Sequence, residues 1–175
     1  MPLSPWQNFY VIVGSSAGAL TGLQFVVITL IAQTRAAADM SAIRAFATPT
    51  VIHFCSTLFI AAVMTMPWPN IMGLAACLLI GGLAGVIYSV RVIRHARASH
   101  YDPDREDWLW YAGFPIAAHL TLLAVACLMW WYSPAALFVL AADTLVFLLI
   151  GIHNAWDSVT YMVVEHSRRT EKSNH

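Results

Sequence analysis

The residues best suited to chemistry lie in the last apolar segment of the chain, where polar side chains recur at helical spacing. Asn154, Asp157 and Tyr161 each fall within about 40° of the direction of Asp143 on an α-helix. His153 flanks this stripe, one turn before Asp157. A carboxylate near the middle of a membrane helix costs roughly 2.5–3.5 kcal/mol, so it should face a partner or water. Asp and His in such positions commonly form relays for protons or ions.

Two further histidines lie inside apolar segments and could join this stripe. His53 and His153 fall at similar depth, and His119 lies somewhat higher. A cluster of His53, His119, His153, Asn154 and Asp157 is therefore geometrically allowed. Four interpretations stay open: a hydrogen-bonded network that holds the helices in register, a proton or ion site, a metal site formed by the three histidines and Asp157, and a haem ligated by His53 and His153.

Glycines form a second pattern that could have a function. Gly14, Gly18 and Gly22 recur every four residues in the first apolar segment, and Gly81 and Gly85 form a similar notch in the third. Small residues at this spacing let helix backbones approach closely, which favours helix association in a membrane. Three roles stay open for these faces: helix packing within one chain, a subunit interface, or the lining of a pore.

The composition shows what kind of element must position these residues. Of the 175 residues only 10% are charged and 59% are hydrophobic, and the mean hydropathy is +0.68. Residues 45–90 and 108–142 contain no Asp, Glu, Lys or Arg. Because a helix needs about 20 mostly apolar residues to cross a bilayer, each run must hold at least one span. The sequence predicts an integral membrane protein.

Several classes of protein are excluded by the same reading. No stretch outside the apolar segments is long enough to build the core of a soluble domain. The net charge is zero and no basic stripe is present, which argues against nucleic-acid binding. No glycine-rich phosphate loop occurs, so no nucleotide partner is expected.

Apolar length, prolines and flanking charge divide the chain into five expected helices, an all-α bundle in a single transmembrane domain. Pro67 and Pro69 form a tight turn, Pro115 and Gly113 should kink the fourth helix, and the tail after Glu165 should be frayed. The expected helices are residues 7–33, 45–66, 71–98, 108–132 and 134–165.

The basic residues predict the orientation of this bundle. They fall in three places, at residues 35–44, 91–105 and 168–172, which five alternating spans put on one side of the membrane. We therefore expect the N-terminus outside and the C-terminus in the cytoplasm. Aromatic residues at both interfaces agree: Trp6, Tyr10, Trp68, Trp130, Trp131 and Tyr132 outside, and Trp108, Trp110, Tyr111 and Tyr161 inside.

Three segments carry a resemblance to a known group of proteins: NFYVIVGSSAG at residues 8–18, TPTVIHF at 48–54 and GIHNAWD at 151–157. Together they resemble small bacterial inner-membrane proteins of five helices that have no assigned function. The His-Asn-Ala-Trp-Asp part of the last segment is the most specific. The resemblance implies a multi-pass protein of the bacterial cytoplasmic membrane, and it implies no substrate, cofactor or mechanism.

The leading functional hypothesis is a homo-oligomeric channel- or transporter-like protein that handles protons or small ions through the His and Asp cluster. Its partners would be the lipid bilayer, a second copy of the chain and the ions themselves. One alternative is a membrane redox or accessory subunit that binds haem or a transition metal. Another is an assembly or scaffold protein without catalysis. No cofactor is favoured, and an enzyme is less expected than a non-enzyme.

Overall fold

The computed structural model describes residues 3–34, 40–98, 105–129, 131 and 134–173, and within these ranges it leaves the side chains of 31–34, 40–47, 96, 98 and 161–173 undescribed. Within this part of the chain, all regular structure is helical. Five of the described helices are long and apolar enough to cross a membrane. The prediction of an all-helical chain with five such helices is confirmed.

The helices follow one another with short connections. A 3₁₀ turn, η1 (Ser4–Trp6), leads into the first long helix, and one π-helical turn, η2, lies within the fourth candidate span. The remaining elements are α1 (Gln7–Thr34), α2 (Met40–Thr65), α3 (Ile71–Ala98), α4 (Arg105–Trp108), η2 (Leu109–Gly113), α5 (Phe114–Met129) and α6 (Pro134–Ser173).

Two helix ends differ from the expected ones by five residues or more. The second helix begins at Met40 rather than at about Ala45. The last helix continues to Ser173, past Glu165 and through the tail that we expected to be frayed. Residues 166–173 contain no proline or glycine, so nothing in their sequence forces the helix to stop.

The distortion expected near Pro115 is present as a π-helical turn. The backbone N–H of Phe114 donates to the carbonyl of Leu109, five residues earlier. Pro115 has no N–H to donate, which makes a change of helical register inexpensive at this point. The turn carries Trp110 and Tyr111 into the bundle just before α5 begins.

The turn between α2 and α3 is fixed by side chains. Trp68 Nε1 donates to the carbonyl of Val63 at 2.6 Å. The side-chain oxygen of Asn70 accepts from the backbone N–H groups of Met72 and Gly73 at 3.1 and 3.4 Å, as an N-cap does. This confirms the tight turn that the two prolines predict. We call the end of the bundle at which this turn lies the turn end.

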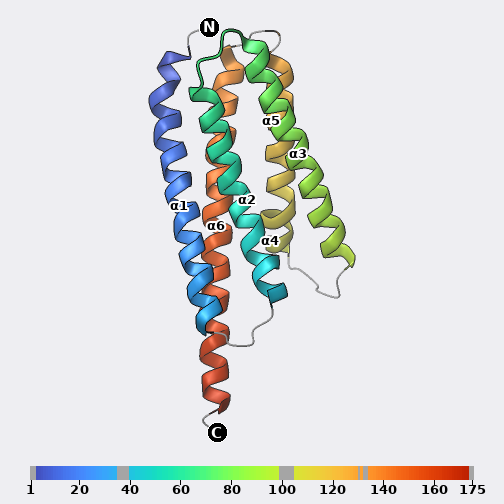
Figure 1. Ribbon diagram of the computed structural model, residues 1–175. Coiled ribbons are helices and arrows are strands. Elements are labelled where there is room, and N and C mark those ends of the chain that lie inside the picture. Colours follow the sequence, from blue (N-terminus) through green and yellow to red (C-terminus); the bar gives the residue numbers. More distant parts are fainter. Residues whose placement is uncertain (1–2, 35–39, 99–104, 130, 132–133, 174–175) are drawn as a thin grey trace.

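The helices form one elongated bundle (Figure 1). α2 packs against α6, α6 against α5, and α5 against α3, while α1 lies on the outside and packs mainly on α2. The contact between α2 and α3 is less extensive. Below the other helices, α6 extends alone toward the C-terminus (Figure 1).

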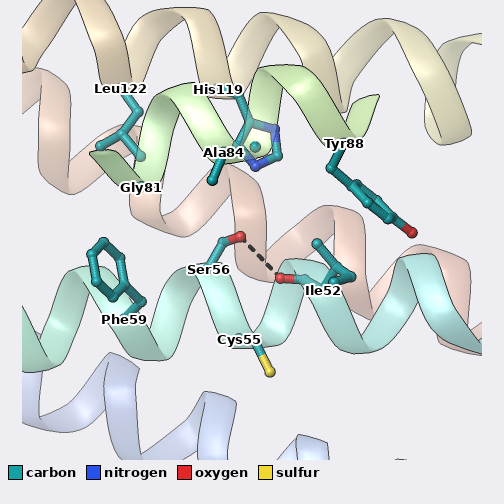
Figure 2. Close-up of a pocket in the computed structure, with 10 residues that line it drawn as sticks. Ile52, Cys55, Ser56, Phe59, Gly81, Ala84, Tyr88, His119 and Leu122 are labelled. Carbon is teal, nitrogen blue, oxygen red and sulfur yellow. Dashed lines mark hydrogen bonds between the residues drawn. The ribbon is translucent and has the colours of Figure 1, made fainter. Parts of the chain in front are cut away.

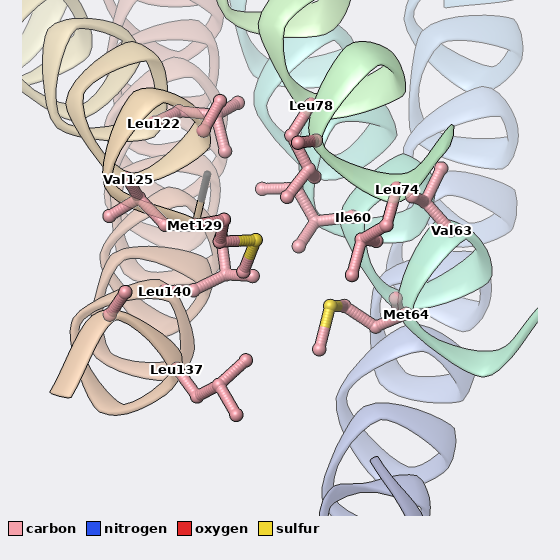
Figure 3. Packing of buried hydrophobic residues seen from close by; sticks show 14 of the residues in the cluster. Ile60, Val63, Met64, Leu74, Leu78, Leu122, Val125, Met129, Leu137 and Leu140 are labelled. Carbon is pink, nitrogen blue, oxygen red and sulfur yellow. The ribbon is translucent and has the colours of Figure 1, made fainter. Parts of the chain in front are cut away.

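The apolar core packs between the helices, and the residues labelled in Figure 3 lie toward the turn end of the bundle, near the ends of α2 and α5 and the starts of α3 and α6. Most of the core consists of aliphatic and methionine side chains of α2, α3, α5 and α6, and it also includes Tyr10 of α1 and Phe147 of α6, which lie beside polar residues. Its labelled members are Ile60, Val63, Met64, Leu74, Leu78, Leu122, Val125, Met129, Leu137 and Leu140.

Candidate functional site

Buried and half-buried polar side chains recur along α6 from Asp143 to Ser158, and they lie near residues of α1, α2, α5 and the π-helical turn. They form three groups, which we name by their central residues. The Asp143 cluster contains Tyr10 and Thr144, and the His53–His119 pair packs on Phe147. The Asp157 cluster contains Trp110, Tyr111, His153, Asn154 and Ser158.

The Asp143 cluster joins α6 to α1. Asp143 is 5% exposed, and Tyr10 and Thr144 are fully buried. The Tyr10 hydroxyl lies beside Thr144 and close to the Asp143 carboxyl, but outside hydrogen-bonding geometry. Thr144 donates to the carbonyl of Leu140 at 2.7 Å. Asp143 Oδ2 has no hydrogen-bond partner among the described residues.

In the His53–His119 pair, side chains of α2 and α5 approach each other beside α6. The two ring centroids are 6.5 Å apart, and both side chains are 1% exposed. Phe147 packs edge-on against His119 at 4.7 Å and stacks on His53 at 6.5 Å. Gly151 keeps α2 and α6 this close, since a Cβ there would meet the ring of Phe54 at 2.5 Å.

The hydrogen bonds of His119 determine its tautomer. Its Nδ1 lies 2.7 Å from the carbonyl oxygen of Pro115, and a carbonyl can only accept. Nδ1 therefore carries the proton, and in the neutral ring Nε2 has a free lone pair. The hydroxyl of Ser89 lies 3.4 Å from the same Nδ1. For His53, in contrast, Nδ1 is buried without a hydrogen-bond partner in the described part of the chain.

The Asp157 cluster joins α6 to the π-helical turn. The Tyr111 hydroxyl donates to Asp157 Oδ2 at 2.9 Å and lies near the Ser158 side chain. His153 stacks on Trp110, with ring centroids 3.7 Å apart and an angle of 16° between the planes. Both aromatic contacts come from residues that we expected at the membrane interface.

Asn154 is the most unusual member of this cluster. Its side chain is fully buried, and neither Oδ1 nor Nδ2 has a hydrogen-bond partner among the residues that the structure describes. An unpaired buried amide is costly, and such groups often mark functional positions or internal water. Ser158 uses the backbone carbonyl of Asn154 and leaves the amide side chain alone.

The cluster expected from the sequence is therefore divided. His53 and His119 come together, whereas His153 and Asp157 find separate aromatic partners. No group of three His, Cys, Asp or Glu is placed to hold a metal within the described residues. The interpretation as a metal or haem site would rest on His53 and His119. The side chain of Tyr161 lies outside the described residues.

The sequence predicted the polar residues of α6, but it did not predict which aromatic residues of the other helices lie beside them. Tyr10, Trp110 and Tyr111 were assigned to interfacial belts, yet they pack against Thr144, His153 and Asp157. The only signal in the sequence was the position of Trp110 and Tyr111 just before the Gly113–Pro115 distortion. Such distortions commonly accompany functional positions.

The glycines divide into occupied and open positions. A Cβ at Gly14 would meet Ala61 at 2.7 Å, one at Gly81 would meet the ring of Phe59 at 2.5 Å, and Gly85 is covered by the ring of His119. Gly18 and Gly22 have open space beside them, with no described atom within 4 Å. The packing role within one chain thus belongs to Gly14, Gly81 and Gly85.

A pocket of about 250 Å³ opens between α2 and α3, with α5 behind it (Figure 2). His119 and Leu122 come from α5, and Gly81, Ala84, Gly85 and Tyr88 come from α3. Ile52, Cys55, Ser56 and Phe59 complete it from α2. The pocket therefore reaches one member of the histidine pair from the outside of the bundle.

Comparisons with models of protein families, with curated proteins and with solved structures found no match to this chain.

Proposed function

We propose that this chain is a multi-pass membrane protein that conducts protons along the buried polar side chains of α6. The Asp143 cluster, the His53–His119 pair and the Asp157 cluster would be successive proton-transfer sites. Asp143 and Asp157 are 14 residues apart, which is about 21 Å along a helix axis. That covers most of the roughly 30 Å hydrocarbon thickness of a bilayer.

One observation carries this proposal: buried polar atoms without a hydrogen-bond partner recur at each level. In the described part of the chain they are Tyr10 Oη, Asp143 Oδ2, His53 Nδ1, Asn154 Oδ1 and Asn154 Nδ2. A network that only fixed the register of the helices would be expected to satisfy these atoms. Groups that exchange protons with one another, or with intervening water, need free donor and acceptor positions.

The side-chain packing between these proton-transfer sites favours the passage of protons over that of larger ions. Phe147 and Ile150 lie on the same line and are fully buried. A hydrated metal ion could not pass these side chains without a large rearrangement. A proton can move by hopping between hydrogen-bonding groups and single water molecules, for which small side-chain rotations suffice.

The proposed setting is a bacterial cytoplasmic membrane, with the N-terminus outside. The exposed arginines Arg91, Arg94, Arg97 and Arg105 all lie at the α4 end of the bundle, which supports a cytoplasmic location for that end. We further propose that copies of the chain associate through α1, where Gly18 and Gly22 leave an open face.

The experiment is proton flux into liposomes that contain the purified protein, driven by a potassium gradient with valinomycin and read by an internal pH dye. Asp143→Asn and Asp157→Asn should each reduce the flux at least tenfold. Glu106→Gln is the matched control, because Glu106 is exposed and lies outside the polar line. It should leave the flux unchanged.

The same experiment separates the proposal from the scaffold alternative. A scaffold whose polar residues only hold helices together would give no flux above empty liposomes with the unmodified protein. Flux that is retained in both aspartate variants would also contradict the proposed pathway. Size-exclusion chromatography of each variant checks that a loss of flux is not a loss of folding.

A further inference from the structure

The pocket between α2 and α3 has the form of a small-molecule site that opens toward the membrane. It exists because α3 presents Gly81, Ala84 and Gly85 where larger side chains would close the gap to α2. Cys55, Phe59 and Ala84 at its edge are exposed in the middle of apolar helices. A molecule that enters would therefore arrive from the lipid phase.

His119 provides the polar end of this pocket. Its side chain is 1% exposed and extends from α5 toward α3 beside Ala84 (Figure 2). The Cδ2–Nε2 edge of the ring is the part that lies against Gly85. Since Nδ1–H is used by Pro115, the group offered to the pocket is the Nε2 lone pair, a hydrogen-bond acceptor. Nε2 makes no hydrogen bond to any described residue.

The other polar groups at the pocket do not supply a donor to a ligand at His119. The Ser56 hydroxyl donates to the carbonyl of Ile52 at 2.9 Å, as the dashed line in Figure 2 marks. The Tyr88 hydroxyl points away from His119 in the same view (Figure 2). A ligand that binds beside the imidazole must therefore bring its own donor.

The size of the pocket limits the ligand further. Sites for drug-sized molecules usually measure about 300–1,000 Å³, so the pocket of about 250 Å³ suits a single ring or a short chain. Its walls are mainly apolar, with the rings of Phe59 and Tyr88 and the side chains of Ile52 and Leu122. The ligand should therefore have an apolar body with one polar group.

We propose that this pocket binds a membrane-soluble molecule with an apolar body and one hydroxyl group, whose O–H donates a hydrogen bond to Nε2 of His119. A phenol with a short alkyl chain and an aliphatic lipid alcohol share this chemistry. The site goes beyond proton conduction, and its binding test does not depend on any flux.

The test uses the full chain in lipid nanodiscs with 4-octylphenol as probe and 4-octylanisole as the matched compound that lacks a donor. Nε2 of His119 is observed by NMR in protein labelled with ¹⁵N-histidine. We expect saturable binding of octylphenol that shifts this resonance, and binding of octylanisole that is at least about fivefold weaker. Comparison with 1-dodecanol distinguishes the sources: a preference for the phenol indicates an aromatic ligand, and equal binding indicates a lipid alcohol.

Two substitutions on α3 locate the site. Ala84→Phe should fill the pocket and reduce octylphenol binding at least tenfold. Ala76→Phe is the control, because Ala76 is also exposed on α3 but does not line the pocket. Equal binding of the phenol and the anisole would overturn the proposal, as would the absence of saturable phenol binding or full binding to the Ala84→Phe variant.

Discussion

The hydroxyl of Tyr111 donates a 2.9 Å hydrogen bond to Oδ2 of Asp157, and this bond ties the π-helical turn before α5 to α6. The turn places Tyr111 where a regular helix would not, because one extra residue rotates the backbone before Pro115. The bond gives a carboxylate inside an apolar helix a charge-assisted partner. The distortion of one helix thus stabilises the polar residue of another.

Removal of the Tyr111 hydroxyl should destabilise the fold, and the size of the loss measures how much its hydrogen bond to Asp157 contributes. Tyr111→Phe leaves Asp157 without its tyrosine donor in a partly buried site, so we expect a loss of about 1–3 kcal/mol in the free energy of unfolding. Thermal unfolding in detergent measures this change. Tyr88→Phe is the control, since the half-buried Tyr88 hydroxyl makes no comparable bond to a carboxylate in the described residues. Equal stability of both variants would show that the bond contributes nothing.

For Asn154 we predict the opposite effect, a gain in stability when its polar side chain is replaced. Both polar atoms of its amide are buried without a described partner, so Asn154→Leu removes a desolvation cost while it keeps the side-chain volume. We expect the free energy of unfolding to rise by about 1–3 kcal/mol. If Asn154 belongs to the proton path, the same variant should lose flux in liposomes. A gain of stability together with a loss of flux would identify a residue kept for function at the expense of stability.

A destabilised Asn154→Leu variant would contradict this reasoning. It would mean that the amide has partners, such as ordered water, that hold the helices together. Thr144→Val provides the comparison, because Thr144 already donates to the Leu140 carbonyl and its loss should change stability only slightly.

Gly85 should be the least replaceable glycine of α3. The His119 ring lies where a Cβ at this position would be, so Gly85→Ala must displace the imidazole from Pro115 or move α3 away from α5. We expect a loss of about 1–3 kcal/mol in stability, the usual cost of overpacking. Circular dichroism during heating gives the midpoint of unfolding. Gly113→Ala is the matched control, since a Cβ there would make only ordinary contacts at 3.5 Å or more. Equal midpoints of the two variants would contradict the close packing of His119 on α3.

The helices and the rotation of α6 could be predicted from the sequence, because both depend on apolar length and the 100° period of a helix. The structure buries Asp143 and Asn154 and leaves Trp156 70% exposed, which agrees with the expected stripe. Burial alone does not say which helix lies opposite. That information depends on how five helices pack, and no local pattern encodes it.

The residues that lie opposite the polar stripe of α6 could not be predicted from the sequence. The positions of Tyr10 and Tyr111 in the sequence are typical of aromatic residues at a membrane interface. In the structure, however, the two side chains lie near Asp143 and Asp157 of α6. Pro115 predicted a distortion, although not that it would be a π-helical turn that redirects Tyr111. The sequence predicts His53 and His153 at similar depth and His119 somewhat higher. The 6.5 Å separation of the His53 and His119 rings depends on how α2 and α5 both pack beside α6, which the sequence does not give.

The proposed association of copies through α1 can be tested with two glycines of the same helix. Gly18→Val meets open space in the single chain, so it should leave the stability of the monomer unchanged and weaken any dimer that uses this face. Gly14→Val would press on Ala61, so it should instead lower stability by loosening α1 from α2. Light scattering after size-exclusion chromatography gives the mass of each variant, and thermal unfolding gives its stability. An unchanged oligomer with Gly18→Val would place the interface elsewhere. If the unmodified chain is itself a monomer at every concentration, the open face of α1 is covered by lipid.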